Sequence, residues 1–330
     1  MVYLLILKMK IIKKLNEIKS DYYKRKIQKV ISTSSYKEAL SEVIIKKCYG
    51  HLDPSTIETK WAKKDVEDNL LKRILDVENN LIPWINDVYD FSGKTILEIG
   101  CGTGSMTIPF ALRAKNIIAC DVWETIDVAG KRANLFGCDN VNFILHPFDW
   151  ASDEKVIRSF LADFPKVDMV TMDAVLEHLT ISERLNLLKE VWDFLPPGGV
   201  LVIYETPNRL FYYDAHTFLL PFINSLPDEL AVLYAKNKSP RKEFLDELEQ
   251  ENWQTRLYKA GRGVSYHEFE LSIDFNKMKI LNDGYSALLR NRQDDEYCQV
   301  LKNIFKKHIP HIPNGFTKEY IDLIIQKIKE

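Results

Sequence analysis

The stretch Thr95-Ile-Leu-Glu-Ile-Gly-Cys-Gly-Thr-Gly-Ser-Met106 decides the fold of this chain. Five mostly apolar residues lead directly into Gly100, Gly102 and Gly104, and a helical pattern runs from Met106 to about residue 114. This order predicts a buried strand, a tight glycine turn and a helix. Glycine has no Cβ, and the first turn of a helix carries unpaired N–H groups, so a ligand can approach the backbone of such a turn closely. We therefore expect the stretch to bind a cofactor.

The spacing of the glycines distinguishes two kinds of cofactor. A dinucleotide-binding turn has the pattern Gly-x-Gly-x-x-Gly, and its third glycine permits close packing of helix on strand. Here that position is Ser105, and Glu98 precedes three alternating glycines instead. The resulting Glu-x-Gly-x-Gly-x-Gly pattern resembles motif I of the class I S-adenosylmethionine-dependent methyltransferases. The resemblance implies S-adenosyl-L-methionine as the cofactor and a doubly wound, Rossmann-like α/β sheet.

The chain from residue 95 alternates strand and helix patterns, which predicts a parallel sheet with helices on both faces. The expected strands are 95–99, 116–120, 141–145, 167–172 and 200–205. Later segments are expected to form helices at 228–234, 241–251 and 266–273 and a short strand at 278–281. The tail beyond residue 294 is expected to be mostly helical, with breaks at Pro310 and Pro313.

Four parts are expected along the chain. They are a helical N-terminal region on the lid or substrate side (1–90), an S-adenosylmethionine-binding core (91–205), a substrate-binding cap insertion (206–264), and the remaining core sheet with C-terminal helices (265–330). The insertion is recognisable because about 60 residues follow the fifth strand, whereas connections in such folds usually span about 2–6 residues.

Acidic residues follow the expected strands, and ligands of open parallel sheets bind beyond the carboxyl ends of the strands. The methyltransferase resemblance implies that Asp121 binds the two ribose hydroxyls and that Asp149 meets the adenine. An acceptor-only carboxylate suits two vicinal hydroxyls, although either aspartate could instead cap the following helix. The expected cofactor-binding residues are Glu98, Gly100, Cys101, Gly102, Gly104, Asp121, Val122, Phe148, Asp149, Trp150, Asp173 and Ala174.

The segment Asp173-Ala-Val-Leu-Glu-His-Leu179 resembles the residues after strand four in quinone-pathway-like small-molecule methyltransferases. Enzymes that methylate exocyclic amines of bases or glutamine carry Asn/Asp-Pro-Pro-Tyr at this place, and this chain does not. The resemblance therefore implies transfer to an oxygen.

A hydroxyl acceptor must lose its proton, and histidine is the side chain that titrates near neutral pH. The expected catalytic residues are His178, His216 and His267, although each could instead make only structural hydrogen bonds. Asp214 and Glu268 lie beside the last two in sequence and could orient their imidazole rings.

Residues after the fifth strand are expected to bind the acceptor. The run Thr206-Pro-Asn-Arg209, with Asp214-x-His216-Thr217, resembles a signature of bacterial methyltransferases found with glycan and secondary-metabolite pathways. Arginine could pair with a phosphate or carboxylate, or with a structural partner. The expected substrate-binding residues are Asn208, Arg209, Tyr213, Asp214, Arg262, Tyr266 and Glu268. Asp214 with His216, and His267 with Glu268, offer oxygen and nitrogen ligands, but the two pairs are far apart in sequence and nothing fixes their geometry, so no metal site is expected.

Composition limits the partners of the 330-residue chain. A net charge of −2 gives no general attraction to nucleic acid, and five scattered cysteines suit a reducing compartment and a cytoplasmic location. The apolar start, Met1 to Leu7, meets lysines at once and is far shorter than the roughly 20 residues of a membrane span. We expect a small-molecule acceptor, no nucleic acid and no stable membrane insertion, with the oligomeric state open.

Aromatic and polar residues in the insertion favour a small hydroxylated acceptor, first of all a sugar, a nucleotide-linked sugar or a surface-polysaccharide component. A quinone or other aromatic metabolite is the alternative, and a cap lined almost wholly by apolar residues would favour it. Two further classes stay open: a regulatory protein that binds the cofactor without catalysis, and a nucleic-acid methyltransferase tethered by the basic residues 8–47.

Overall fold

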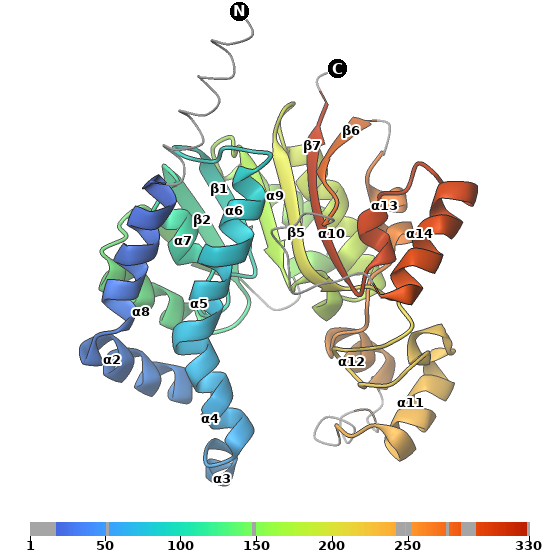
Figure 1. Cartoon of the computed structure of the whole chain (residues 1–330), viewed down its shortest axis with the longest axis horizontal. Coiled ribbons are helices and arrows are strands. Elements are labelled where there is room, and N and C mark those ends of the chain that lie inside the picture. The colour runs from blue at the N-terminus through green and yellow to red at the C-terminus, as the bar shows by residue number, and fades with distance from the viewer. Residues whose placement is uncertain are drawn as a thin grey trace, which may run out of the picture. The chain divides into compact units, whose positions relative to one another are not determined.

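The computed structural model in Figure 1 describes residues 18–50, 53–146, 150–241, 248, 252–274, 277–284 and 295–328. Its internal contacts divide the chain into two compact units. The first contains residues 1–83 and 101–145, and the second contains residues 84–100 and 146–330. The four parts expected from the sequence have different boundaries and stay a prediction.

The first unit joins the N-terminal helices to the glycine turn and one pair of strands. Residues 18–31 are helical, and Thr33 and Thr59 cap the next two long helical runs by accepting hydrogen bonds from the backbone N–H groups of Tyr36 and Ala62. Its elements are α2 (Ser34–Ile44), α3 (Pro54–Ile57), α4 (Lys60–Glu67), α5 (Arg73–Asp76), the start of α6 (Ile82–Asn86), α7 (Thr107–Ala111), β2 (Asn116–Asp121), α8 (Ile126–Phe136) and β3 (Val141–Leu145). Strands β2 and β3 pair in parallel.

One apolar cluster holds this unit together. Ile27, Leu40 and Ile44 from the N-terminal helices pack with Ile108 of α7 and Phe136 of α8, and all five are buried. Burying a large apolar side chain stabilises a fold by about 1.5–3 kcal/mol. The N-terminal helices therefore share a hydrophobic core with the helices that flank the glycine turn.

Arg132 of α8 connects the same parts through polar contacts. Its side chain is completely buried. Nε donates to the carbonyl oxygen of Thr103 in the glycine turn (2.9 Å), and the two terminal nitrogens donate to the Tyr36 hydroxyl (2.6 Å) and to the carbonyl oxygen of Asn69 (2.9 Å). Asn69 in turn accepts a hydrogen bond from the Thr103 hydroxyl (3.0 Å). The guanidinium thus fixes the glycine turn against two N-terminal helices.

We expect Arg132→Ala to lower the free energy of unfolding by about 2–4 kcal/mol, because buried carbonyl groups lose their donor. Chemical denaturation followed by circular dichroism measures the change. Lys131→Ala is the matched control, since Lys131 is the exposed neighbour on the same helix. Equal stability of the two variants would contradict the role given to Arg132.

The second unit contains the other five strands, in the order β1-β4-β5-β7-β6. Strands β1, β4 and β5 are parallel, whereas β7 runs antiparallel between β5 and β6. Helix α10 packs against α9 and α13 (Figure 1). The main elements are β1 (Thr95–Ile99), α9 (Glu154–Ala162), β4 (Met169–Asp173), α10 (Ile181–Phe194), β5 (Val200–Pro207), α11 (Asp228–Lys238), α12 (Trp253–Lys259), α13 (Tyr266–Ser272), β6 (Met278–Asn282), α14 (Glu296–His308) and β7 (Tyr320–Lys327).

The insertion after β5 has a small core of its own. Phe218, Ile223 and Ala231 are buried there with Leu257 of α12. Helices α11 and α12 lie together below the strands in Figure 1. The expected helix at 241–251 falls almost entirely outside the described residues.

The structure confirms the Rossmann-like α/β class and the five expected strands up to residue 207, with shifts of one or two residues at their ends. The parallel pairing expected for these strands is confirmed, whereas the expectation of a mostly helical tail was wrong. Residues Tyr320–Lys327 form β7, whose Ile321 and Leu323 are completely buried. A short apolar run fits a buried strand and a buried helix equally well by periodicity, so pairing with β5 and β6 decides its structure.

Among the described residues, no helix has the length and apolar character needed to span a membrane.

Candidate functional site

The glycine turn and the end of β2 form a cradle within the first unit. Gly102 (φ 51°) and Gly104 (φ 77°) have left-handed backbones. A Cβ on Gly104 would lie 2.8 Å from Ala129, so a larger residue does not fit. The carboxylate of Asp121 accepts hydrogen bonds from the N–H groups of Gly102 (2.6 Å) and Trp123 (2.9 Å). Asp121 therefore shapes the turn and ends the strand at the place expected for a ribose-binding acid.

The environment of Asp121 is compatible with binding ribose hydroxyls. Burial raises the pKa of its carboxyl group, and the backbone N–H groups around it oppose the rise. Cys101 is buried, and its N–H donates to the carbonyl oxygen of Cys120 (3.0 Å). Val122, the next expected residue, is half-buried after the strand. A bare backbone turn beside an acceptor-only carboxylate suits a ligand with vicinal hydroxyls.

The remaining residues expected at the cofactor lie in the second unit. Glu98 is buried in β1, and Gly100 follows with φ 77°. A Cβ on Gly100 would lie 2.4 Å from Cγ2 of Val175, so the glycine lets the segment after β4 approach the end of β1. Asp173 ends β4, Trp150 is buried in a short 3-10 helix, and Phe148 and Asp149 lie outside the described residues.

Ala174, immediately after β4, has a left-handed backbone (φ 51°) although it is not glycine. Its N–H donates to the carbonyl oxygen of Tyr204 in β5 (3.0 Å). Backbone strain of this kind costs about 1–3 kcal/mol and gathers at functional sites. The strained turn leads directly into the 3-10 helix Leu176–His178.

That 3-10 helix contributes to a cluster of three side chains. One ligand-type atom each from Glu177, His178 and His216 lies within 4.8 Å of the others. Glu177 is completely buried, His216 is half-buried and His178 is exposed. The rings of the two histidines are 5.4 Å apart between centroids. His178 and His216 were expected from the sequence, whereas Glu177 was not, although it precedes His178 in the Glu-His-Leu segment.

Buried hydrogen bonds fix the backbone of the segment that carries Glu177 and His178. Arg184 of α10 is completely buried and donates to the carbonyl oxygens of Leu176 (2.7 Å), Glu177 (3.4 Å) and Gly263 (3.1 Å). It also pairs with the Glu268 carboxylate (3.0 Å). On the other side, a Cβ on Gly261 would lie 2.2 Å from Nδ1 of His216, so only glycine leaves room for that ring.

Burial also sets the protonation of the cluster. It raises the pKa of Glu177 to about 8. Burial is also the main cause that lowers the pKa of His216 to about 4, and electrostatic interactions with the neighbouring His178 and Arg241 contribute. Although His178 is exposed, desolvation by the surrounding protein lowers its pKa as well. Both imidazoles are therefore neutral at physiological pH and carry a free lone pair.

His267 is not part of the cluster among the described residues. Its Nδ1 lies 3.1 Å from the Ser265 hydroxyl, and its ring stacks on Tyr266 at 3.9 Å between centroids. Glu268 accepts from the Ser265 N–H and closes a capping box at the start of α13. These three expected site residues lie together at one helix start.

The other expected substrate residues mainly hold the fold. Asn208 donates to the carbonyl oxygens of Phe316 and Lys318 (2.7 Å each). Asp214 accepts from three backbone N–H groups, including that of His216 (3.0 Å), and so orients the histidine loop. The Tyr213 hydroxyl donates to the carbonyl oxygen of Leu219.

Arg209 and Arg262 both form ion pairs with Asp228. The distance from the guanidinium nitrogen to Oδ1 of Asp228 is 3.5 Å for Arg209 and 3.1 Å for Arg262. Arg262 is completely buried and also donates to Asn224 Oδ1 (3.0 Å). Their charges are therefore directed toward a carboxylate of the chain itself.

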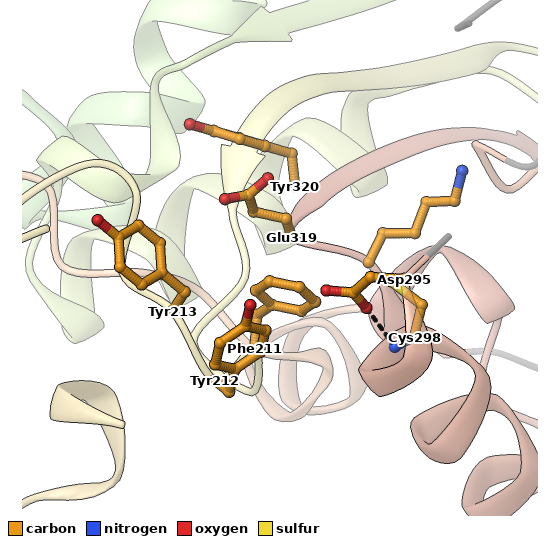
Figure 2. A pocket seen from close by; sticks show the side chains of 8 residues that line it. Phe211, Tyr212, Tyr213, Asp295, Cys298, Glu319 and Tyr320 are labelled. Atoms are coloured by element: carbon orange, nitrogen blue, oxygen red, sulfur yellow. Dashed lines mark hydrogen bonds between the residues drawn. The ribbon is translucent and has the colours of Figure 1, made fainter. Parts of the chain in front are cut away.

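A pocket of about 150 Å³ lies beside the start of β7. Figure 2 shows Phe211 and Tyr212 opposite Asp295 and Cys298, which lie at the start of α14. The Tyr212 ring lies 5.1 Å from that of Tyr297, between centroids. The pocket thus combines an aromatic wall with a carboxylate and suits a flat ring that carries polar groups.

Comparison with known proteins identifies the class of the chain. A family model described as "Methyltransferase domain" matches residues 72–266. The chain belongs to this methyltransferase family. The match includes both the glycine turn and the histidine cluster, and S-adenosylmethionine is the cofactor of the methyltransferase.

Individual relatives of the methyltransferase are distant. The ubiquinone biosynthesis O-methyltransferase of Azotobacter vinelandii is 24% identical over 46% of this chain and 59% of its own length. Phosphoethanolamine N-methyltransferase 1 of Triticum aestivum is 26% identical over 49% of this chain and 32% of its own. The solved structure of PKMT2 from Rickettsia typhi with AdoHcy is 12% identical, with a TM-score of 0.45 over 75% of this chain and 53% of that chain. The methyltransferase thus spans less than two thirds of these relatives.

We expect Asp121→Ala to weaken binding of S-adenosylmethionine to the methyltransferase at least about tenfold, because hydrogen bonds to a charged group contribute about 1.5–3 kcal/mol. Calorimetric titration measures the dissociation constant. Asp121→Asn separates charge from shape, and Asp139→Ala, at an exposed position, is the control. Unchanged affinity in Asp121→Ala would exclude the ribose role.

Proposed function

We propose that the protein transfers the methyl group of S-adenosylmethionine to an oxygen of a small hydroxylated acceptor. The observation that carries the proposal is the cluster of Glu177, His178 and His216, which places two neutral imidazoles beside a buried carboxyl group. When bound, S-adenosylmethionine supplies a methyl group on a sulfonium: the new O–C bond forms as the S–C bond breaks, and the electron pair stays on sulfur to leave S-adenosylhomocysteine. The proton of the hydroxyl must leave in the same reaction.

The hydrogen bonds of His178 define which of its nitrogens can act. Its Nδ1 lies 3.0 Å from the carbonyl oxygen of Lys259. A carbonyl oxygen can only accept, so Nδ1 carries the hydrogen and Nε2 carries the lone pair. A fixed tautomer of this kind leaves one nitrogen available for the chemistry of the hydroxyl group.

The arginines of the second unit favour an acceptor without a phosphate group. Phosphoethanolamine, the acceptor named for the wheat relative, would need a cation for its phosphate. Arg209 and Arg262 instead face Asp228, whose single carboxylate offsets one of their two positive charges. A neutral hydroxylated molecule needs no such cation.

An aromatic acceptor is the more specific proposal. The curated relatives named above include a quinone-pathway O-methyltransferase and no protein named for a carbohydrate, so the sugar interpretation has no support from them. The aromatic wall of Phe211 and Tyr212 lies on the same segment as His216 and suits a stacked ring. The cytoplasmic location and the exclusion of nucleic acid stay predictions from composition.

The test is release of S-adenosylhomocysteine with a panel of hydroxylated aromatic compounds, sugar nucleotides, phosphoethanolamine and RNA. We expect turnover with hydroxylated aromatic compounds. His216→Ala is expected to lower kcat by about 10²–10⁴-fold, and His308→Ala, at an exposed position of α14, should retain it.

Preference for phosphoethanolamine or RNA would contradict the proposal. Tight cofactor binding without turnover of any compound would instead support the regulatory alternative. Wild-type turnover in His216→Ala would remove the histidine cluster from the reaction.

A further inference from the structure

The carboxyl group of Glu177 receives no hydrogen bond from another side chain in the part of the chain that the structure describes, and only its own backbone and the charge of Arg184 favour its ionised form. Both of its oxygens are fully buried and make no hydrogen bond there. The nearby Arg184 guanidinium donates to the backbone carbonyl of Glu177 and pairs its charge with Glu268. A buried acidic group without a partner is costly, so its environment calls for a ligand.

Two imidazoles lie beside this carboxyl group. The ligand-type atoms of Glu177, His178 and His216 lie within 4.8 Å of one another. Ligand atoms of one ion are about 3.4 Å apart at adjacent tetrahedral positions and about 4.2 Å apart on opposite sides, when each bond is about 2.1 Å long. Side-chain rotations that draw the three atoms closer together would bring them onto one ion.

The surroundings of the histidines are those of metal ligands. The Lys259 carbonyl accepts from Nδ1 of His178 (3.0 Å), which leaves Nε2 as the donor atom. A metal-binding histidine usually has this second contact, because it fixes the tautomer and the ring orientation. His216 is held by the close approach of Gly261 and by the Asp214 carboxylate, which accepts from its backbone N–H.

We propose that Glu177, His178 and His216 bind one divalent transition-metal cation. Two imidazoles and one carboxylate are the ligand set of such ions, whereas Mg²⁺ and Ca²⁺ prefer oxygen ligands throughout. His178 is exposed, so solvent or a substrate oxygen can reach the open coordination positions. No metal was expected from the sequence, because the ligand types considered there fall in two distant pairs that do not include Glu177.

The assignment deepens the proposed function and rests on it for its catalytic meaning. The cation would polarise the acceptor hydroxyl and release its proton to water, while the oxygen keeps the electron pair that forms the O–C bond. The histidines then act as ligands instead of accepting the proton themselves.

The first test is direct binding to the full-length protein after dialysis against a chelator. We expect calorimetric titration with Co²⁺ or Zn²⁺ to give one site per chain, and the visible spectrum of bound Co²⁺ to show nitrogen and oxygen ligands without a thiolate band. Mg²⁺ should bind far more weakly. Binding of neither transition metal, or a spectrum dominated by cysteine thiolate, would overturn the assignment.

Variants locate the site. We expect Glu177→Gln and His216→Ala to weaken Co²⁺ binding by about 100-fold or more, whereas the exposed His308→Ala should bind as the wild type does. Circular dichroism of each variant checks its fold. If a variant does not fold, the rise in Tm that Co²⁺ causes in the wild type and in His308→Ala still tests binding. Wild-type affinity in a folded Glu177→Gln or His216→Ala would overturn the assignment.

Gly261 offers a finer test. Its φ is 112°, and an added Cβ would meet the His216 ring. We expect Gly261→Ala to weaken Co²⁺ binding about 10–100-fold. Gly93→Ala is the matched control, because Gly93 also has a left-handed backbone (φ 70°) but has open space where the Cβ would lie. An equal effect of the two substitutions would show that backbone strain, and not the position of His216, controls binding.

These outcomes separate the two proposals. Cobalt binding that needs Glu177, together with no methyl transfer to any compound, retains the metal site and removes the proposed function. Methyl transfer that persists without metal, in a protein that does not bind cobalt, retains the proposed function and removes the metal site.

Discussion

The histidine cluster depends on one buried charge, the guanidinium of Arg184. It lies inside the second unit with no exposed surface and donates to carbonyl groups on the segments 176–177 and 262–263. Glu268 balances its charge. Removing a buried charge from its partner is far more costly than losing a surface ion pair. The guanidinium therefore fixes the backbone of both segments.

The first unit also has a buried guanidinium that binds backbone carbonyl groups. Arg132 fixes the carbonyl group of Thr103 in the glycine turn and the helices that precede it in sequence. The turn itself has few side-chain atoms to pack, because its glycines are needed for the left-handed backbone and for close approach. A buried guanidinium with several donors supplies the missing rigidity from outside the turn.

Four acidic residues of the protein differ in their hydrogen-bond and ion-pair partners. Asp121 is satisfied by the backbone N–H groups of Gly102 and Trp123. Asp214 and Asp228 are used by the histidine loop and by the arginines. Glu177 is buried, and in the described chain its carboxyl oxygens accept no hydrogen bond from another residue. Only the distribution of hydrogen bonds makes this distinction, because all four are simply acidic residues in the sequence.

The sequence by itself determined the cofactor class and the first five strands. Those features depend on local patterns: alternating glycines after a buried strand, an acid after the next strand, and strand and helix periods that repeat in order. It did not determine β7, because an apolar run such as Tyr320–Lys327 becomes a strand only by pairing with β5 and β6. Nor did it show that Glu177 is buried and unpaired beside His216, nearly 40 residues away in sequence, or that Arg262 meets Asp228. Burial and hydrogen bonding between distant segments are properties of the folded chain, so only the tertiary structure decided which of the candidate residues form a site.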